Sequence, residues 1–288
     1  MFHILSLLMG IMITIMIAVN GGLTTHYGVY TATVIIHLVG LIVIIAVVLY
    51  KRERFFPARY AWFLYMGGAI GVFTTVANNL SFGRISVSAI LALGLLGQSV
   101  TGFVIDQYGL LGMKKYPFAK QQLIGLSLIL AGIGAMINSF EIVAVIVSFL
   151  AGFTIVMSRT LNARLSAVTS VRVSTFYNYL VGLVVSGLFL LVLGRGEIAF
   201  AELTLSPSWY IYLGGVLGVA VVLLSNIVVV RVSAFYLTLL IFVGQVFSGV
   251  LIDVFLAQEV VLRNVFGGVL VAAGLSINLI LDSRQRVQ

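Results

Sequence analysis

Four residue types recur twice in this 288-residue chain, in the same order and at the same spacing. The pattern is Arg, thirteen residues, Gln, three residues, Gly, three residues, Asp. On a helix that turns about 100° per residue, the four side chains of one copy fall on a single stripe. The two copies are Arg84, Gln98, Gly102 and Asp106, and then Arg231, Gln245, Gly249 and Asp253.

The charged residues of this stripe suggest a pair of gates. Arg84 and Asp106 are separated by about 33 Å of helix, which is close to the thickness of a bilayer's hydrocarbon core. If the two stripes are antiparallel, Arg84 meets Asp253 at the outer end and Arg231 meets Asp106 at the inner end. Two such ion pairs could open alternately in a transporter. The alternative is that these charges anchor helix ends among the lipid headgroups.

Uncharged polar residues give a second set of candidates, for contact with a solute. Gln98 and Gln245 lie about 12 Å from the Asp-bearing end of each stripe, and either bind solute or bond a neighbouring helix. The same two interpretations apply to five asparagines, for which bonds between helices are favoured because they lie near span ends. These asparagines are Asn20, Asn79, Asn162, Asn178 and Asn226.

Aromatic residues surround Asn178 in the sequence. Phe176, Tyr177 and Tyr179 would suit a planar or cationic solute, although they could equally pack against lipid. His37 is the single histidine within an apolar run. It could relay protons, but no carboxylate is in reach by sequence, so packing between helices is favoured.

The elements that must position these residues are membrane-spanning helices. The chain is 61% hydrophobic and 8% charged, whereas a soluble domain is about a quarter charged. About 20 helical residues cross a bilayer, and lipid admits only helices or closed barrels. No alternating β pattern appears, so we predict an all-α polytopic protein with ten transmembrane helices. The apolar runs are 4–19, 34–50, 61–77, 85–105, 123–137, 142–157, 176–193, 209–230, 232–252 and 265–281.

The distribution of basic residues predicts the orientation. Of the 16 Lys and Arg residues, all but Arg84, Arg195 and Arg263 fall in segments on one side, among them Arg159 and Arg164 in the segment after the sixth run. Short cytoplasmic loops carry such an excess, so both termini are predicted to be cytoplasmic. The charge is spread over loops without a basic patch, so we expect no nucleic-acid partner. The expected partners are the lipid bilayer and a small-molecule solute, with the chain a monomer or homodimer.

An internal repeat relates two halves of five spans each, 1–140 and 141–288. An odd number of spans gives the halves opposite orientations, a recurring transporter design with the solute near the midplane between the halves. The matched residues are Gly10 with Gly152, Asn20 with Asn162, Gly40 with Gly182, Gly67, Gly68 and Gly71 with Gly214, Gly215 and Gly218, Asn79 with Asn226, Gly97 with Gly244, and Gly125 and Gly132 with Gly267 and Gly274.

Several of these stretches resemble a known family. Gly97 to Asp106, Gly244 to Asp253, Val261 to Gly267 and Leu180 to Gly182 look like the YdcZ-type proteins of the drug/metabolite transporter superfamily, here as two fused units. The resemblance implies a ten-helix inverted-repeat fold in the bacterial plasma membrane, and export or uptake of small metabolites. The chain departs from the pattern where Ile36, beside His37, stands at the position that Asn178 has in the second half.

The sequence therefore predicts a transporter of small solutes, a metabolite or a drug-like compound of cationic or aromatic character, working by alternating access. A lipid flippase or a non-transporting membrane scaffold is the alternative. The chain contains no cysteine, no phosphate-binding loop, no metal-ligand cluster and no nucleophile motif. We therefore expect no enzymatic activity, no metal and no cofactor.

Overall fold

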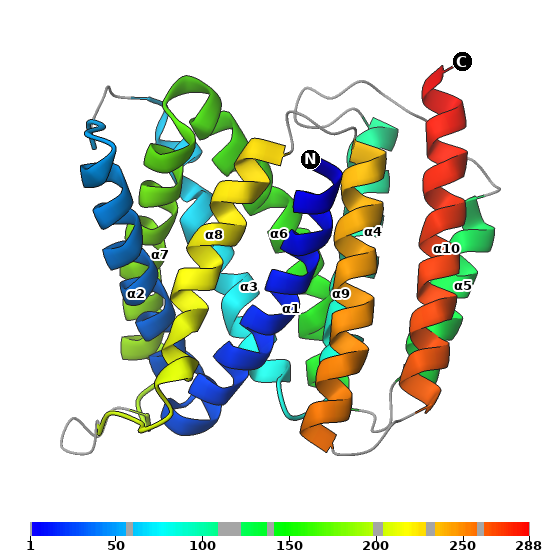
Figure 1. Ribbon diagram of the computed structural model, residues 1–288, viewed down its shortest axis with the longest axis horizontal. Coiled ribbons are helices and arrows are strands. Elements are labelled where there is room, and N and C mark those ends of the chain that lie inside the picture. Colours follow the sequence, from blue (N-terminus) through cyan, green and yellow to red (C-terminus); the bar gives the residue numbers. More distant parts are fainter. Residues whose placement is uncertain are drawn as a thin grey trace. The chain divides into compact units, whose positions relative to one another are not determined.

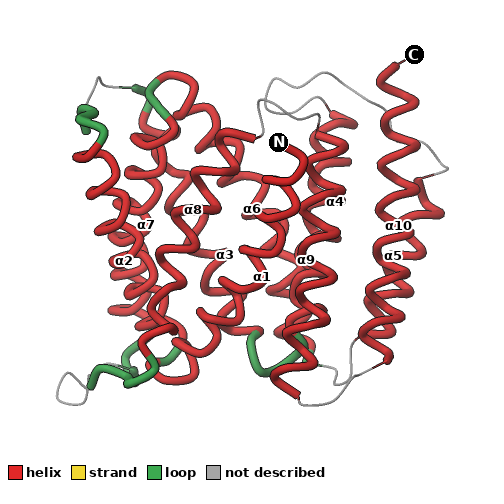
Figure 2. Tube along the Cα trace, viewed as in Figure 1, coloured by secondary structure: helices red, strands yellow, loops and turns green. Residues whose placement is uncertain are grey.

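A computed structural model of the chain describes residues 2–55, 60–108, 122–136, 141–197, 204–228, 234–257 and 262–287. These residues form α-helices, two 3₁₀ helices and connecting loops, and contain no β-strand (Figures 1 and 2). The elements are α1 (Phe2–Tyr27), α2 (Val29–Tyr50), η1 (Trp62–Met66), α3 (Gly67–Ser81), α4 (Val87–Tyr108), α5 (Gln122–Met136), α6 (Ile142–Val168), α7 (Val171–Leu193), η3 (Trp209–Tyr212), α8 (Leu213–Val228), α9 (Ala234–Ala257) and α10 (Leu262–Val287).

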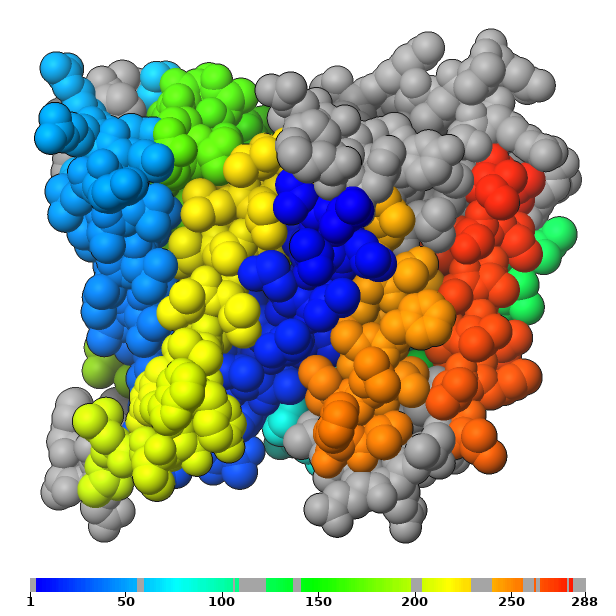
Figure 3. All heavy atoms as spheres, in the orientation of Figure 1, coloured from blue at the N-terminus to red at the C-terminus, as the bar shows by residue number. Residues whose placement is uncertain are grey.

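The predicted helical membrane protein is confirmed in class. Six helical segments are long and apolar enough to cross a bilayer: Ile4–Tyr27, Val29–Tyr50, Val87–Ile105, Ile142–Val168, Val171–Leu193 and Trp209–Val228. Leu123–Met136, Leu240–Phe255 and Val265–Asn278 are shorter apolar helices. Large apolar side chains are exposed along the helices, as on α2 and α8 in the face drawn in Figure 3. Such a surface suits contact with lipid rather than water.

Helices α1 and α6 continue furthest past the ends of their apolar runs. The runs 4–19 and 142–157 end before Asn20 and Arg159, but α1 continues to Tyr27 and α6 to Val168. Polar side chains end an apolar run without ending a helix, because the backbone bonds to itself and the side chain bonds elsewhere. The assignment of Arg159 and Arg164 to a segment between helices was therefore wrong, since both lie within α6.

The described residues group into two compact units. Unit 1 comprises Met1–Thr14, Ser81–Val156 and Val228–Gln288, and unit 2 comprises Ile15–Leu80 and Met157–Ile227. Unit 1 thus holds α4 and α5 with α9 and α10, and unit 2 holds α2 and α3 with α7 and α8. Helices α1 and α6 contribute their first part to unit 1 and the rest to unit 2. Each compact unit therefore draws on both predicted halves of the sequence, while the boundary at residue 140 stays a prediction about the repeat.

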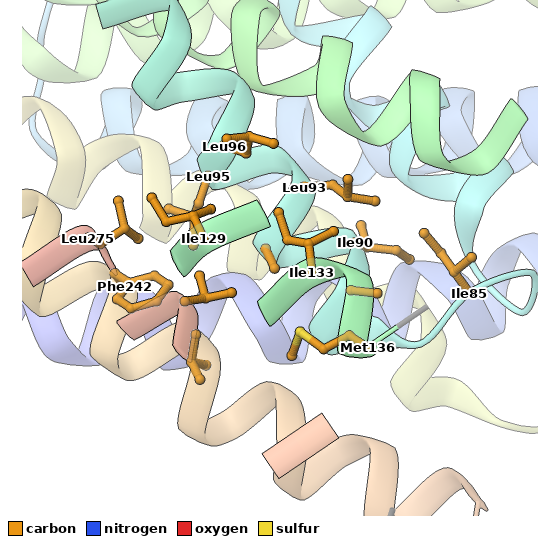
Figure 4. Packing of buried hydrophobic residues seen from close by; sticks show 14 of the residues in the cluster. Ile85, Ile90, Leu93, Leu95, Leu96, Ile129, Ile133, Met136, Phe242 and Leu275 are labelled. Carbon is orange, nitrogen blue, oxygen red and sulfur yellow. The ribbon is translucent and has the colours of Figure 1, made fainter. Parts of the chain in front are cut away.

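Unit 1 is built around an apolar cluster and a close helix pair. Side chains of α4, α5, α9 and α10 meet in the cluster, including Ile90, Ile133, Phe242 and Leu275 (Figure 4). Helices α5 and α10 pack through four glycines that were matched in the repeat. Gly125 faces Gly274 and Gly132 faces Gly267, so closely that a Cβ at any of the four would overlap the other helix. Small residues allow membrane helices to approach in this way.

Unit 2 has an equivalent pair in α2 and α7. Gly40 lies against the ring of Tyr179, and Gly182 lies against the ring of His37. The contacts run in opposite directions along the two helices, so α2 and α7 are antiparallel. Leu41, Ile44, Val48, Phe176, Tyr179 and Val219 form the apolar cluster around this pair.

Candidate functional site

A buried pair of amides joins α6 to α7 in unit 2. The Asn162 Nδ2 donates a hydrogen bond to the Asn178 Oδ1 at 2.8 Å. The Asn162 main-chain carbonyl accepts a second bond, from the Ser174 hydroxyl at 2.7 Å. All three residues are buried. Both amides are therefore held in fixed orientations, because two helices share their bonds.

The first turn of α3 completes this cluster. The Ser158 hydroxyl donates to the Gly67 carbonyl at 2.8 Å. Gly67 lies directly against the Asn162 amide, and Gly68 against the Asn178 carbonyl, with no room for a Cβ at either position. We call Ser158, Asn162, Ser174 and Asn178, with Gly67 and Gly68, the Asn162 cluster.

The repeat-equivalent residues form a second cluster in unit 2, between α1, α2 and α8. Asn20 lies against Gly214, and the Ile36 carbonyl lies against Gly215. Asn20 corresponds to Asn162, Gly214 and Gly215 to Gly67 and Gly68, and Ile36 to Asn178. We call Asn20, Ile36, Gly214 and Gly215 the Asn20 cluster. The residues that the repeat matched in sequence thus make matched contacts in space.

The two clusters differ in their hydrogen bonding. Ile36 offers no amide, and the Asn20 Oδ1 has no hydrogen-bond partner among the described residues. Asn20 is only 6% exposed, and an unpaired buried acceptor costs about 1–3 kcal/mol. The Asn20 cluster therefore presents a hydrogen-bond acceptor that none of the described residues uses.

His37 of α2 and Asn79 of α3 both form hydrogen bonds with Thr33 of α2. The His37 Nδ1 is 2.8 Å from the Thr33 carbonyl, which only accepts, so Nδ1 carries the proton. The Asn79 Nδ2 donates to the Thr33 hydroxyl oxygen at 3.1 Å. The repeat equivalent, Asn226, is buried but its Nδ2 has no partner among the described residues. The His37 ring centroid lies 5.9 Å from that of Tyr179, so among the described residues His37 makes the contacts of a residue packed between helices.

The aromatic residues beside Asn178 take part in separate contacts. Phe176 and Tyr179 are buried in the apolar cluster of unit 2. The Tyr177 ring meets Tyr65 at 4.6 Å and the Phe176 ring at 5.3 Å, both edge to face. Tyr177 is thus the member of this set whose ring is half-buried and outside the core of the cluster.

In unit 1, the two glutamines of the repeated stripe differ in burial. Gln98 is half-buried, and its Nε2 reaches the Gly94 carbonyl of its own helix at 3.4 Å. Gln245 is 5% exposed, and its Oε1 has no partner among the described residues. The Gln245 main-chain carbonyl accepts from the Thr14 hydroxyl at 3.3 Å, which ties α9 to α1. Gln245 is therefore a second buried acceptor that remains unused.

The glycines that precede these glutamines form equivalent helix crossings. Gly97 of α4 meets Gly152 of α6, and Gly244 of α9 meets Gly10 of α1. Both pairs were matched in the repeat, and a Cβ at any of the four would overlap the backbone opposite.

Asp253 binds the start of α4. Its carboxylate accepts from the Val87 N–H at 2.8 Å and the Ser88 N–H at 3.1 Å, and also from the Ser88 hydroxyl. These donors lie three and four residues after Arg84, and a helix N-terminus favours an anion. The gate between Arg84 and Asp253 stays a prediction. Asp253 binds residues that follow Arg84 closely in the sequence, so both residues lie at the same end of unit 1. Arg231 and the Asp106 side chain lie outside the described residues.

Two acidic residues that were not among the candidates fasten the α2–α7 pair. The Glu197 carboxylate follows α7 and accepts from the N–H groups of residues 29–31 at 2.9–3.0 Å, at the start of α2. Glu53 follows α2 and pairs with Arg172 and Ser170 at the start of α7. The two contacts are equivalent, but Glu53 and Glu197 are 144 residues apart, whereas matched residues of the repeat are 142 apart, as Asn20 and Asn162, or 147 apart, as Asn79 and Asn226.

The partners of Glu53 change its acidity. Burial alone would raise the pKa of the Glu53 carboxyl, but the hydrogen bonds from Arg172 and Ser170 and the positive charge of Arg172 outweigh it. The pKa of Glu53 therefore lies below its usual value of 4.5, and the carboxylate is charged at neutral pH.

In the comparison with known proteins, one family matches the two halves of the chain separately. The family described as "Putative inner membrane exporter, YdcZ" matches residues 1–135 and, separately, residues 143–277. A solved structure described as "Crystal structure of protein" aligns with 98% of this chain and 96% of its own, with a TM-score of 0.65 and 16% sequence identity. At that identity the likeness concerns the fold alone. Comparison with curated proteins gives no match.

Proposed function

We propose, from the premise that this chain belongs to the YdcZ family and is a multi-pass inner-membrane transporter, that it moves a small organic solute by alternating access. In this proposal the two family units are inverted repeats with ten spans in all. The direction is export, in keeping with the family description. The alternatives of a lipid flippase and a membrane scaffold are separated by the experiment below.

One observation carries the proposal: repeat-equivalent residues make equivalent contacts. Asn162 on Gly67 corresponds to Asn20 on Gly214, and the Gly97–Gly152 crossing corresponds to the Gly244–Gly10 crossing. A chain with two sets of equivalent contacts can exchange the conformations of its repeats at little net cost in free energy. Such an exchange opens a site first to one side of the membrane and then to the other.

The buried amides are the proposed solute contacts. The Asn20 Oδ1 and the Gln245 Oε1 are acceptors without partners among the described residues. A solute that donates N–H or O–H groups would satisfy such acceptors and so recover the cost of burying them. The expectation of an aromatic solute keeps Tyr177 as a candidate, because its ring is outside the core of the apolar cluster.

The proposed orientation, with both termini cytoplasmic, can be tested directly because the chain contains no cysteine. Lys51 and Leu205 are exposed in loops that follow α2 and precede η3. In intact cells, a membrane-impermeant maleimide should label a single cysteine at Leu205→Cys and not one at Lys51→Cys. In disrupted cells it should label both. Labelling of both, or of Lys51→Cys alone, in intact cells would refute the proposed topology.

Transport itself is tested in proteoliposomes loaded with a mixed panel of metabolites and drugs, with mass spectrometry of what leaves. We expect selective release of one solute class, reduced by Asn20→Leu and retained by Thr25→Leu. Thr25 lies on the same helix, and among the described residues its hydroxyl bonds only to the Gly21 carbonyl in its own turn. Movement of fluorescent phospholipid between leaflets without solute release would favour a flippase. The absence of both activities would favour a scaffold.

A further inference from the structure

A basic residue lies deep within α6 of unit 2. Arg159 is seventeen residues after Ile142 and nine before Val168, so about 25 Å and 13 Å of helix separate it from the two ends. A guanidinium inside a membrane span is costly unless it pairs with an anion or faces water, and such residues mark solute or ion pathways. The position of Arg159 therefore calls for a partner.

No partner for Arg159 is present among the residues that the structure describes. Arg159 makes no hydrogen bond, ion pair or ring contact with them. The described acidic residues of unit 2 are Glu53 and Glu197, which bind the starts of α7 and α2. The Arg159 side chain is half-buried. A positive charge thus lies partly enclosed by protein, with no counter-ion among the described residues.

The surroundings of Arg159 are polar on one side. Ser158 precedes it, and Asn162 follows three residues later, which places the Asn162 side chain next to that of Arg159 on the helix surface. Both belong to the Asn162 cluster. Ile17, the repeat equivalent of Arg159, is 5% exposed, so this helix position points into protein in the first repeat. The charge therefore lies beside fixed hydrogen-bonding groups.

We propose that Arg159 binds the anionic group of the transported solute, a carboxylate, sulfonate or phosphate. The inference rests on the proposed transport function and specifies its solute class. A guanidinium binds such groups through two parallel N–H bonds, and the Asn162 cluster lies beside it. A cationic solute would be repelled by the same uncompensated charge. The sign of the solute charge is thus opposite to the cationic character expected from the sequence.

The rival explanation is that Arg159 extends along α6 toward the lipid headgroups as a topological anchor. Arg164 provides the matched control, because it is an exposed arginine of the same helix, five residues further on. An anchoring role would affect both arginines alike. A solute-binding role concerns Arg159 alone.

Binding is tested with a probe set that varies charge on one ring: benzenesulfonate, benzenesulfonamide and benzyltrimethylammonium. Phenylglyoxal modifies accessible arginines, and mass spectrometry reports modification at Arg159 and Arg164 in detergent-purified protein. We expect benzenesulfonate to slow modification of Arg159 severalfold, with no effect on Arg164 and none from the other two probes. Equal protection by all three probes, or none by benzenesulfonate, would overturn the proposal.

Transport supplies the second arm, in proteoliposomes that contain panels of organic anions, neutral solutes and cations. Arg159→Gln should lower anion transport about tenfold or more, Arg159→Lys should retain part of it, and Arg164→Gln should leave it unchanged. Unchanged anion transport in Arg159→Gln, or preference for cations, would refute the role of Arg159 while the transport function stands. No transport of any class would refute the proposed function itself. Protection of Arg159 by phospholipid vesicles without solute would assign the anion to a lipid headgroup and overturn the solute proposal.

Discussion

The substitution Gly97→Ala tests the crossing of α4 and α6 most directly. A Cβ at Gly97 would overlap the Phe149 carbonyl oxygen and lie 3.1 Å from the Gly152 Cα. The atoms opposite are backbone, so no side chain can rotate away and the helices must separate. Gly102 lies five residues further along α4, and a Cβ there would meet no atom within 4 Å. Gly102→Ala is therefore a matched control.

The expected magnitude comes from comparing the two variants. Replacing Gly by Ala inside a helix gains about 0.8–1.0 kcal/mol, and this gain cancels between the two positions. What remains at Gly97 is overpacking, which typically costs about 1–3 kcal/mol. Separating the helices by about 0.5–1 Å also forfeits about a quarter to a half of each contact along the crossing. Gly97→Ala should thus be less stable than Gly102→Ala by about 1–3 kcal/mol.

The assay is reversible unfolding in mixed micelles by titration with dodecyl sulfate, followed by far-ultraviolet circular dichroism. The free energy of unfolding of each variant is compared with that of the parent protein. Gly102→Ala should be as stable as the parent or more so, and Gly97→Ala should unfold at lower detergent fraction. Equal stability of the two variants would refute the close approach at Gly97.

The repeat extends this prediction to the second crossing. A Cβ at Gly244 would overlap the Leu7 carbonyl oxygen and lie 3.2 Å from the Gly10 Cα. Gly244→Ala should therefore lower the free energy of unfolding by a similar amount to Gly97→Ala. A penalty at Gly97 without one at Gly244 would show that the two crossings are not equivalent, and would weaken the argument for alternating access.

Three further predictions concern polar contacts. A double-mutant cycle of Asn162→Leu and Asn178→Leu should give a coupling of about 0.6 kcal/mol, and up to about 1.7, in the same unfolding assay, and no coupling would argue against the amide pair. Glu53→Gln should destabilise the protein at neutral pH. Because the pKa of Glu53 is lowered by folding, this difference should persist above about pH 4.5 and disappear as the pH falls through the lowered pKa; a pH-independent difference would contradict the ion pair. Asp253→Asn should weaken the cap on α4 and speed amide hydrogen exchange in its first turn, and unchanged exchange at Val87 and Ser88 would refute it.

Sequence reasoning located the helices well where apolar character and helix end together. The predicted runs 34–50 and 176–193 end at the same residues as α2 and α7. It failed at α1 and α6, where Asn20 and Arg159 lie inside the helix. Hydropathy measures the preference of a side chain for lipid. A helix can nevertheless continue through a polar residue whose side chain contacts other parts of the protein.

The repeat predicted which residues correspond, but not which residues touch. Gly40 and Gly182 are matched in the repeat, 142 residues apart. Yet each glycine packs on the ring of the residue three positions before the other: Gly40 on Tyr179, and Gly182 on His37. The repeat matches residues at the same place in two segments of the sequence. Because α2 and α7 are antiparallel, residues matched in this way do not in general lie opposite one another. Backbone partners were also missed. Asp253 and Glu197 bind backbone N–H groups, which almost every residue type has, so the sequence does not indicate which of them will act as donors.

The departures from symmetry fit a chain in which two units are fused. Two identical five-helix units would carry the same residue at both equivalent positions, so both clusters of unit 2 would be alike. Fusion allows Asn178 to accept a bond from the Asn162 Nδ2, whereas Ile36 offers the Asn20 Nδ2 no such acceptor. It likewise places a charge at Arg159 and an apolar side chain at the equivalent Ile17. The two clusters therefore differ in chemistry: a charged side chain follows Ser158 of the Asn162 cluster, whereas the Asn20 Oδ1 is an acceptor without a partner among the described residues.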